Sequence, residues 1–203
     1  MTNLESTVFV VDDDDAVRDS LLDLVDSVGL NVEAFSSAQS FLDSYDPLRP
    51  GCLVLDIRMP GMSGLDLQDR LSEIGSVLPI IFITGHGDIP MAVRAMQRGA
   101  VDFIQKPFRD QELLDRINDA LEKGTRSFEV QEQQAEFTLR VKNLTQRERE
   151  VMEMIVNGKA NKVIAIDLGL SQRTVELHRA RVMEKMKART LADLVRMVTK
   201  VIR

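Results

Sequence analysis

Four polar positions in the first half of the chain carry the residue types of a phosphoryl-transfer site. They are the four aspartates of residues 12–15, the lone Asp56, Thr84 and Lys106. Carboxylates that gather in one crevice repel one another and need a cation, and a site with oxygen ligands alone suits Mg²⁺. The lysine would supply a second cation and the threonine a hydroxyl donor. One carboxylate could then accept a phosphoryl group, because positioning and charge neutralisation are most of that task.

The elements that must position these residues are short strands. Each polar position follows an apolar run, and most of the runs are continuous, as expected for strands buried on both faces. The runs are residues 8–11, 32–35, 52–55, 80–83 and 103–104. Alternation of these runs with helical patterns predicts a parallel sheet with helices on both faces and right-handed crossovers. Ligands collect at the carboxyl ends of such strands, so the four polar positions should meet at one edge.

Apolar residues at helical spacing mark the helices between these strands. Pro90 is expected near the start of the fourth helix and Gly99 just after its end. The positions that mark the first, third and fifth helices are Leu21, Leu22, Val25, Val28, Leu65, Leu67, Leu71, Leu113, Leu114, Ile117, Ala120 and Leu121.

The acidic run has a second interpretation, as a solvated helix start that the helix dipole favours. This interpretation accounts for Asp14 and Asp15. It does not account for Asp56 and Lys106 at two other strand ends.

Charge divides the chain into an acidic front and a basic back. The 203 residues carry a net charge of −6, made up of −12 in residues 1–123, −1 in residues 124–140 and +7 in residues 141–203. The net acidity therefore does not exclude nucleic acid as a partner of the basic segment. We predict a first domain over 1–123, a polar linker over 124–140 that is either coil or a continuation of the fifth helix, and a second domain over 141–203.

Composition excludes several classes of protein. Hydrophobic residues make up 44%, which is enough for an ordinary core and excludes a disordered chain. A single cysteine, Cys52, excludes a disulfide framework, and with only two histidines a zinc site is poorly supported. No apolar run approaches the roughly 18–20 residues of a transmembrane helix. Residues 1–7 lack the pattern of a secretory signal, so we expect a cytoplasmic protein without membrane contact.

The basic segment has the pattern of a small all-α domain of four helices with a helix-turn-helix. Thr145 and Glu148 form a capping box at the start of a helix that should end at Asn157 and Gly158. Ser171 is placed to cap a later helix, after a tight turn. The three helices expected after the first cover about residues 162–168, 172–186 and 191–201.

The third of these helices has one face for packing and one for contact. An outward face with two arginines, a leucine and an alanine suits the major groove, where arginine pairs with guanine and apolar groups meet thymine methyls. The outward positions are Arg173, Glu176, Leu177, Ala180 and Arg181, and the inward ones are Val175, His178, Val182 and Met186. The residues better placed for phosphates are Lys162, Arg179, Lys185 and Lys187. An ordinary solvated helix would show the same pattern.

Four strings in order, at residues 10–13, 54–64, 83–88 and 99–108, resemble the receiver domain of two-component response regulators. The resemblance implies a flavodoxin-like (CheY-like) α/β fold with five parallel strands in the order 2-1-3-4-5. It implies that Asp56 is the phosphoacceptor and that Asp12 and Asp13 bind Mg²⁺ together with Asp56 and the backbone carbonyl of Arg58. Mn²⁺ or Ca²⁺ is expected to substitute for Mg²⁺.

The same resemblance implies a switch. Thr84 would follow the phosphoryl group, Lys106 would pair with it, and Phe103 would turn from exposed to buried as Thr84 moves inward. Arg58 and His86 occupy the positions that tune how fast water removes the phosphoryl group, although His86 could equally be a plain loop residue. The Lys106–Pro107 bond is expected to be cis.

Three further strings, at residues 144–151, 158–165 and 171–178, resemble the LuxR-type DNA-binding domain. The two halves together resemble FixJ/NarL-type regulators, especially the FixJ branch, over all but the linker. The DNA-contacting positions that this implies are Lys162, Arg173, Thr174, Glu176, Leu177, Arg179, Ala180 and Arg181. Glu176 departs from the lysine of many relatives; it could accept from a cytosine amino group or only reduce phosphate attraction. The apolar stripe of the last helix, at 191, 194, 195 and 198, serves either pairing of two domains or packing within one.

The resemblance implies a transcription factor that a sensor histidine kinase controls by phosphorylation. Its expected partners are promoter DNA, RNA polymerase and a second copy of the chain after phosphorylation, with activation favoured over repression and a mostly monomeric unphosphorylated form. We expect no enzyme activity beyond slow self-dephosphorylation.

A haloacid-dehalogenase-like phosphatase would need an aspartate two residues after the nucleophile, where Arg58 stands. A phosphorylation-independent binder would lack the acceptor, the metal pair and the lysine, all of which are present.

Overall fold

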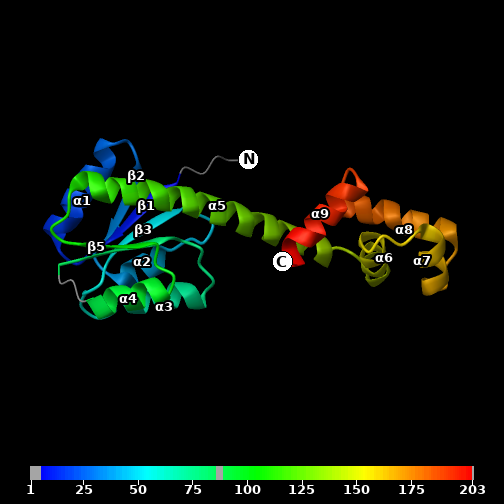
Figure 1. The fold of residues 1–203 in the computed structure, drawn as a ribbon, viewed down its shortest axis with the longest axis horizontal. Coiled ribbons are helices and arrows are strands. Elements are labelled where there is room, and N and C mark those ends of the chain that lie inside the picture. The colour runs from blue at the N-terminus through cyan, green and yellow to red at the C-terminus, as the bar shows by residue number, and fades with distance from the viewer. Residues whose placement is uncertain (1–5, 86–88, 203) are drawn as a thin grey trace. The chain divides into compact units, whose positions relative to one another are not determined.

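The first part of the chain is built around a parallel sheet of five strands in the order β2-β1-β3-β4-β5 (Figure 1). The computed structural model describes residues 6–85 and 89–202. The chain forms two compact units, Met1–Val130 and Gln131–Arg203. The strands are β1 (Thr7–Val11), β2 (Asn31–Phe35), β3 (Gly51–Asp56), β4 (Ile80–Thr84) and β5 (Asp102–Gln105). The predicted α/β class, the parallel pairing and the strand order are all confirmed.

Helices cover both faces of this sheet. On one face lie α1 (Asp15–Ser27) and the first part of α5 (Asp110–Lys142); on the other lie α2 (Ala38–Ser44), α3 (Gly64–Glu73) and α4 (Ile89–Gln97). Alternate residues of β1 serve the two cores, because side chains of a strand point to opposite faces: Phe9 packs in one core and Val10 in the other. The buried central strands agree with their continuous apolar runs, whereas the edge strand β2 is only partly buried.

The helix α2 has no clear apolar periodicity in the sequence, because it spans only seven residues. A capping box between Ser37 and Ser40 begins it. Its Phe41 is buried and meets the rings of Phe9 and Phe35 edge-on, at centroid distances of 5.7 Å and 5.4 Å. Three aromatic rings therefore anchor a helix that is too short to be stable alone.

The helix α5 is 33 residues long and includes residues 124–140, which the sequence left open between coil and helix. Its first part belongs to the first unit, where Leu113, Ile117 and Leu121 are buried in the core. Gly124 lies where the helix passes β3 closely: a Cβ at this position would be 2.2 Å from the carbonyl oxygen of Gly51. A glycine inside a helix is thus explained by close packing.

The second unit contains α6 (Gln146–Val156), α7 (Asn161–Leu168), α8 (Gln172–Lys185) and α9 (Leu191–Ile202). The predicted capping box of Thr145 and Glu148 begins α6, and Ser171 caps α8 by accepting from the backbone N–H of Thr174. Gly169, with a φ of 65°, makes the turn between α7 and α8. A separate apolar core holds these helices, with Val151, Ile164, Val175, Val182, Met186 and Leu194 among its buried members.

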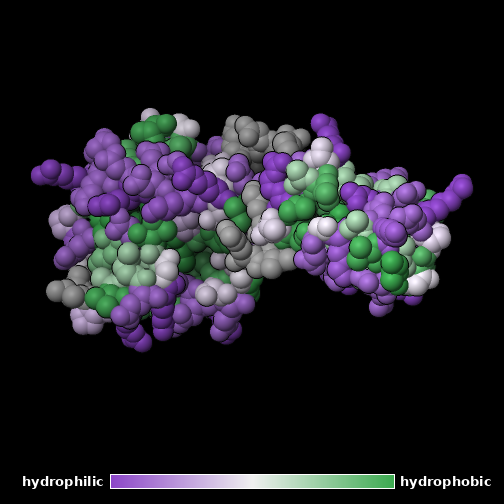
Figure 2. Space-filling model, turned by 45° about the vertical axis from the view of Figure 1, so that its right-hand side comes forward, coloured by the Kyte–Doolittle hydropathy of each residue, from purple (hydrophilic) through white to green (hydrophobic). Residues whose placement is uncertain are grey.

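The visible face of both units carries mainly hydrophilic side chains, with smaller hydrophobic areas between them (Figure 2). Among the helices of residues 6–85 and 89–202, none combines the length and the hydropathy of a transmembrane segment.

Candidate functional site

The carboxyl ends of β1, β3 and β5 bring two aspartates and a lysine into contact. The ammonium nitrogen Nζ of Lys106 lies 2.7 Å from Oδ2 of Asp12 and 3.1 Å from Oδ1 of Asp56. Both carboxylates are buried, with 1% of Asp12 and 7% of Asp56 exposed. Residues separated by as many as 94 positions in the sequence thus form one charged cluster, because parallel strands end at the same edge of the sheet.

The four aspartates of residues 12–15 take different roles at the end of β1. Oδ1 of Asp12 accepts the backbone N–H of Asp14 at 3.0 Å, which helps to fix the buried carboxylate. Asp14 is the N-cap of α1, and Asp15, in the first turn, pairs with Arg18. The interpretation of Asp14 and Asp15 as a helix start is therefore confirmed. Arg18 also donates to the carbonyl of Asp12 at 2.9 Å, a contact that sequence reasoning missed.

The loop after β3 folds back over Asp56. Oδ2 of Asp56 accepts the backbone N–H of Arg58 at 2.6 Å, while the side chain of Arg58 is exposed. Gly64, at the end of the loop, donates its N–H to the carbonyl of Ile57 at 2.9 Å. A Cβ on Gly64 would lie 2.2 Å from the carbonyl oxygen of Asp56, so only glycine permits this return. The loop thereby fixes one oxygen of Asp56 and leaves the other to Lys106.

Burial and charge act in opposite directions on this cluster. Burial raises the pKa of Asp56 above its ordinary value, and the nearby charge of Asp12 adds to the rise, although Lys106 and the N–H of Arg58 oppose it. Burial alone would lower the pKa of Lys106, but the hydrogen bond to Asp12 and the charges of both carboxylates outweigh it, so that the pKa is raised. The lysine is therefore held as an ammonium that two carboxylates share.

Thr84 and Phe103 lie on the last two strands of the sheet, β4 and β5. Thr84 is buried at the end of β4, and its carbonyl accepts the backbone N–H of Lys106 at 2.8 Å. Phe103 pairs with Phe82 across β4 and β5 and is partly buried against one core of the sheet. The Lys106–Pro107 bond is cis, as the resemblance implied. His86 lies outside the described residues.

The donor set for a metal is only partly assembled. Asp13 is exposed, and within residues 6–85 and 89–202 no group of three or more Asp, Glu, His or Cys side chains is close enough to hold a metal ion. Asp12 and Asp56 nevertheless supply two buried carboxylates that converge on one cation, and carboxylate oxygens are the ligands that Mg²⁺ prefers. The chemistry of this pair fits magnesium, and among the side chains that the structure describes no third carboxylate joins the pair.

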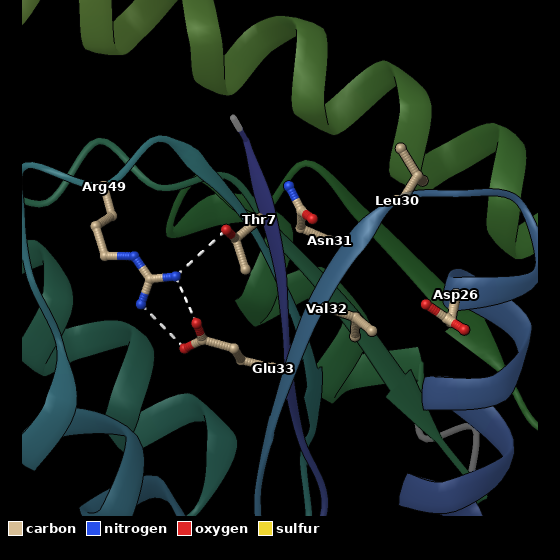
Figure 3. A pocket seen from close by; sticks show the side chains of 7 residues that line it. All are labelled: Thr7, Asp26, Leu30, Asn31, Val32, Glu33 and Arg49. Carbon is tan, nitrogen blue, oxygen red and sulfur yellow. Dashed lines mark hydrogen bonds and ion pairs between the residues drawn. The ribbon is translucent and has the colours of Figure 1, made fainter. Parts of the chain in front are cut away.

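A hollow of about 410 Å³ lies at the opposite end of the strands, so it is separate from the acidic cluster (Figure 3). Two of its charged groups, Arg49 and Glu33, are paired with each other: Nη1 of Arg49 donates to Oε2 of Glu33 at 3.0 Å, and Nη2 reaches Oγ1 of Thr7 at 3.4 Å. The guanidinium also lies over the ring of Phe9, 5.2 Å from its centroid. These contacts are typical of a structural ion pair rather than of a ligand site.

The second unit presents the predicted outward face on α8. Val175, Val182 and Met186 are buried and His178 is partly buried. The five outward positions are all exposed: Arg173, Glu176, Leu177, Ala180 and Arg181. The division of α8 into inward and outward faces is therefore as predicted.

The other predicted DNA contacts divide into free and engaged side chains. Lys162 is exposed near the start of α7. Arg179 is partly buried and donates from Nη1 to Oδ1 of Asn161 at 3.2 Å, which ties α8 to the start of α7. The hydroxyl of Thr174 lies 2.8 Å from that of Ser171. Arg179 and Thr174 thus have structural contacts at the turn in addition to any contact with DNA.

Two parts of the chain match known families of domains. Residues 8–118 match the response regulator receiver domain, and residues 142–198 match the luxR family of bacterial regulatory proteins. Nodulation protein W of Bradyrhizobium diazoefficiens is 52% identical over 95% of this chain and 85% of its own length. The transcriptional regulatory protein FixJ of Azorhizobium caulinodans is 50% identical over 94% of this chain and 90% of its own.

Solved structures give the same result over the full length. The response regulator StyR superposes with a TM-score of 0.86 at 47% identity, covering 97% of this chain and 99% of that one. Full-length FixJ from B. japonicum superposes with a TM-score of 0.59 at 43% identity, covering 98% of each chain. The chain therefore belongs to the response regulators, with a receiver domain followed by a LuxR-type DNA-binding domain. Within this class it is a member of the FixJ branch.

Proposed function

We propose that this response regulator accepts a phosphoryl group on Asp56 from a sensor histidine kinase and thereby controls transcription. The observation that carries the proposal is the contact of Asp12 and Asp56 with the single ammonium of Lys106. An aspartate carboxylate beside a fixed cation is a nucleophile positioned for phosphoryl transfer. The bond from phosphorus to the histidine nitrogen of the kinase breaks as the bond to Asp56 forms.

The residues around Asp56 have separate tasks in this proposal. The N–H of Arg58 orients the carboxylate, and Lys106 neutralises the arriving phosphoryl oxygens. Magnesium, held by Asp12, Asp13, Asp56 and the carbonyl of Arg58, supplies further positive charge when bound, and Mn²⁺ or Ca²⁺ substitutes for it. The carboxylate oxygens of the buried Asp12 and Asp56 support this choice of metal ligands. Asp13 is included because it directly follows Asp12 in the sequence.

Phosphorylation then acts through the adjacent strands. Asp56 exchanges about one negative charge for nearly two. Thr84 donates its hydroxyl to the phosphoryl group, and Phe103 follows into the space behind it, while Arg58 and His86 set the lifetime of the phosphoryl group. This order of events is supported by the backbone contact between Thr84 and Lys106 and by the partial burial of Phe103 on β5.

The output of the switch is promoter binding in the cytoplasm. The phosphorylated receiver forms a homodimer, whereas the unphosphorylated chain is mostly monomeric. The exposed face of α8 reads the major groove, RNA polymerase is recruited, and transcription is activated. This output is supported by relatives that match the chain over most of their length and are named transcriptional regulatory proteins.

The chain is proposed not to act as a phosphatase beyond slow self-dephosphorylation. A phosphatase with an aspartate nucleophile needs an acid/base two residues later, and the residue there is Arg58, whose guanidinium stays charged. The aspartyl phosphate therefore has no protein group at that position to activate water.

Acetyl phosphate with Mg²⁺ tests the proposal on the full chain. We expect the intact mass to increase by one phosphoryl group, the chain to dimerise on size-exclusion chromatography, and binding to promoter DNA to tighten. Asp56→Asn should lose all three responses, whereas Asp43→Asn, an exposed aspartate of α2, should keep them. Steady release of phosphate would instead indicate a phosphatase, and an unchanged mass a phosphorylation-independent DNA-binding protein.

A further inference from the structure

The end of α5 is packed into the second unit. Phe137 and Val141 lie against the apolar core of α6 to α9. The carbonyl of Val141 accepts from Nη2 of Arg149 on α6 at 3.3 Å. The last turns of α5 are therefore part of the DNA-binding unit, although the similarity to the luxR family begins only at residue 142.

Arg140 connects this helix end to the C-terminal end of α8. Its Nη1 donates to the carbonyl of Met186, the C-cap residue of α8, at 3.1 Å. Its Nη2 pairs with Glu136 one turn earlier on α5. Only 19% of its side chain is exposed, so the guanidinium lies mostly within the unit rather than on its surface.

The two neighbours of Met186 in the chain also contact other residues of their own unit. Nζ of Lys185 lies 2.6 Å from Oε2 of the buried Glu148 and 3.2 Å from the carbonyl of Asn143. Nζ of Lys187 lies 3.7 Å from Oε1 of Glu136. Lys185 is thus engaged with a buried carboxylate of its own unit, whereas 71% of the Lys187 side chain is exposed. Contact of these two lysines with phosphates stays a prediction.

Electrostatics explains why cations gather here. The last carbonyls of a helix have no partner within the helix and carry a partial negative charge. Arg140 satisfies one of these carbonyls directly, and its pairing with Glu136 orients the guanidinium. The C-terminal end of α8 is therefore held by a residue of α5, which lies outside the helix-turn-helix.

We infer that Arg140 is a positioning residue for DNA recognition: it fixes the end of α8 against the end of α5 and so sets the direction of the outward face. The DNA part of this inference rests on the proposed function. Arg140 itself does not touch DNA in this inference, since its guanidinium is engaged with Met186 and Glu136. Its removal should loosen the last turn of α8 and weaken DNA binding without changing the number of phosphate contacts.

The test compares Arg140→Met with Arg126→Met in the full chain. Arg126 also lies on α5 and pairs with a glutamate four residues earlier, Glu122, but 74% of its side chain is exposed. A third variant, Arg140→Lys, keeps a donor of the same charge. The DNA probe is a duplex selected by the wild-type chain from a random-sequence pool, and binding is measured over a range of salt at a temperature where every variant is fully folded.

For Arg140→Met we expect DNA affinity to fall about three- to tenfold, with an unchanged slope against salt. Amide hydrogen exchange at residues 183–188 should become faster. Arg126→Met should change neither quantity, and Arg140→Lys should recover much of the affinity. Phosphoryl acceptance at Asp56 should be the same in all variants.

Two results would overturn the inference. Unchanged affinity of Arg140→Met would show that the contact serves stability alone, and a salt slope lower by about one would show that Arg140 binds a phosphate directly. Failure of the wild-type chain to bind any duplex would contradict the proposed function, while the exchange measurement would still decide whether Arg140 holds the end of α8.

Discussion

At the scale of single residues, the ammonium of Lys106 balances only one of the two buried carboxylates that it contacts. Burial therefore disfavours the charged form of Asp56 more than Lys106 compensates for it, and the pKa of this carboxyl is raised. Such a group is a candidate nucleophile, because its charge is only partly compensated until a cation binds beside it. The same imbalance should make the folded receiver less stable than its packing alone would allow.

Asp56→Asn should therefore stabilise the receiver at neutral pH. Because the pKa of Asp56 is raised in the folded state, protonation of this carboxyl stabilises the fold. This stabilisation is fully present below 3.8, the pKa in the unfolded chain, and is lost as the pH rises through the pKa of the folded state. Asparagine removes this loss, so we expect a gain of about 0.5–2 kcal/mol in the free energy of unfolding. Urea titration at pH 7 measures it, with Asp43→Asn as the control. A loss of stability would show that the attraction between Asp56 and Lys106 exceeds the cost of burying the charge of Asp56.

Sequence reasoning brought together Asp12, Asp56 and Lys106 because residues after parallel strands share one edge. It could not give the contact of Arg18 with Asp12 or the return of the loop at Gly64, since both depend on the path of the backbone between elements. It also assigned Asp13 to the metal, and this assignment stays a prediction, because the exposed side chain of Asp13 is not part of the cluster around Lys106. Adjacent residues of a chain turn in different directions, and only coordinates show where a strand ends and a cap begins.

At the scale of elements, α5 shows how tertiary packing decides a helix that propensity leaves open. Residues 124–140 are polar helix formers, and such a sequence alone is compatible with coil or helix. Leu121 before this segment is buried in the core of the first unit, and Phe137 near its end packs against the core of the second. The helices of the second unit were predicted more closely, because capping residues such as Thr145 and Ser171 mark their first turns in the sequence.

Gly124→Ala should destabilise the first unit even though alanine is the better helix former. The new Cβ would lie 2.2 Å from the carbonyl oxygen of Gly51 and 3.2 Å from Cδ of Pro79, so α5 and β3 must separate. We expect a loss of about 1–3 kcal/mol, larger than the gain of up to about 1 kcal/mol from helix propensity. Thermal unfolding measures the change, and Glu129→Ala at an exposed position of the same helix should have little effect. Equal stability of the two variants would mean that the helix adjusts without cost.

At the scale of the whole molecule, the chain consists of two units with separate apolar cores and opposite net charge. Because the cores are separate, we expect two transitions in calorimetry. Substitutions in one core should then move one transition and serve as an internal reference for the other. From the uneven distribution of acidic and basic residues, the sequence predicted a domain over 1–123 and another over 141–203, whereas the two compact units meet between residues 130 and 131.

Acidification should distinguish the two transitions through Glu148. This carboxylate is 2% exposed, and the hydrogen bond from Lys185, followed by the N–H of Thr145, lowers its pKa. Its stabilisation is fully present above the unfolded value of 4.5 and is lost as the pH falls through the lower folded pKa.

Glu148→Gln should therefore destabilise the second unit at pH 7 by about 1–3 kcal/mol and weaken the dependence of its transition on pH below 4.5. Calorimetry between pH 3 and 7 measures both effects. An equal shift of the two transitions, or an unchanged acid response, would contradict the assignment to this pair.

The packing of Phe137 and Arg140 against the second unit also bears on how such proteins are recombined. A chimera joined at residue 142, where the similarity to the luxR family starts, would separate the DNA-binding part from two of its own side chains. A junction placed before Glu136 would carry them along. Exchange of output modules between regulators of this kind should therefore succeed when the crossover lies inside the polar stretch of the long helix, and should yield weakened hybrids when it follows the border of sequence likeness.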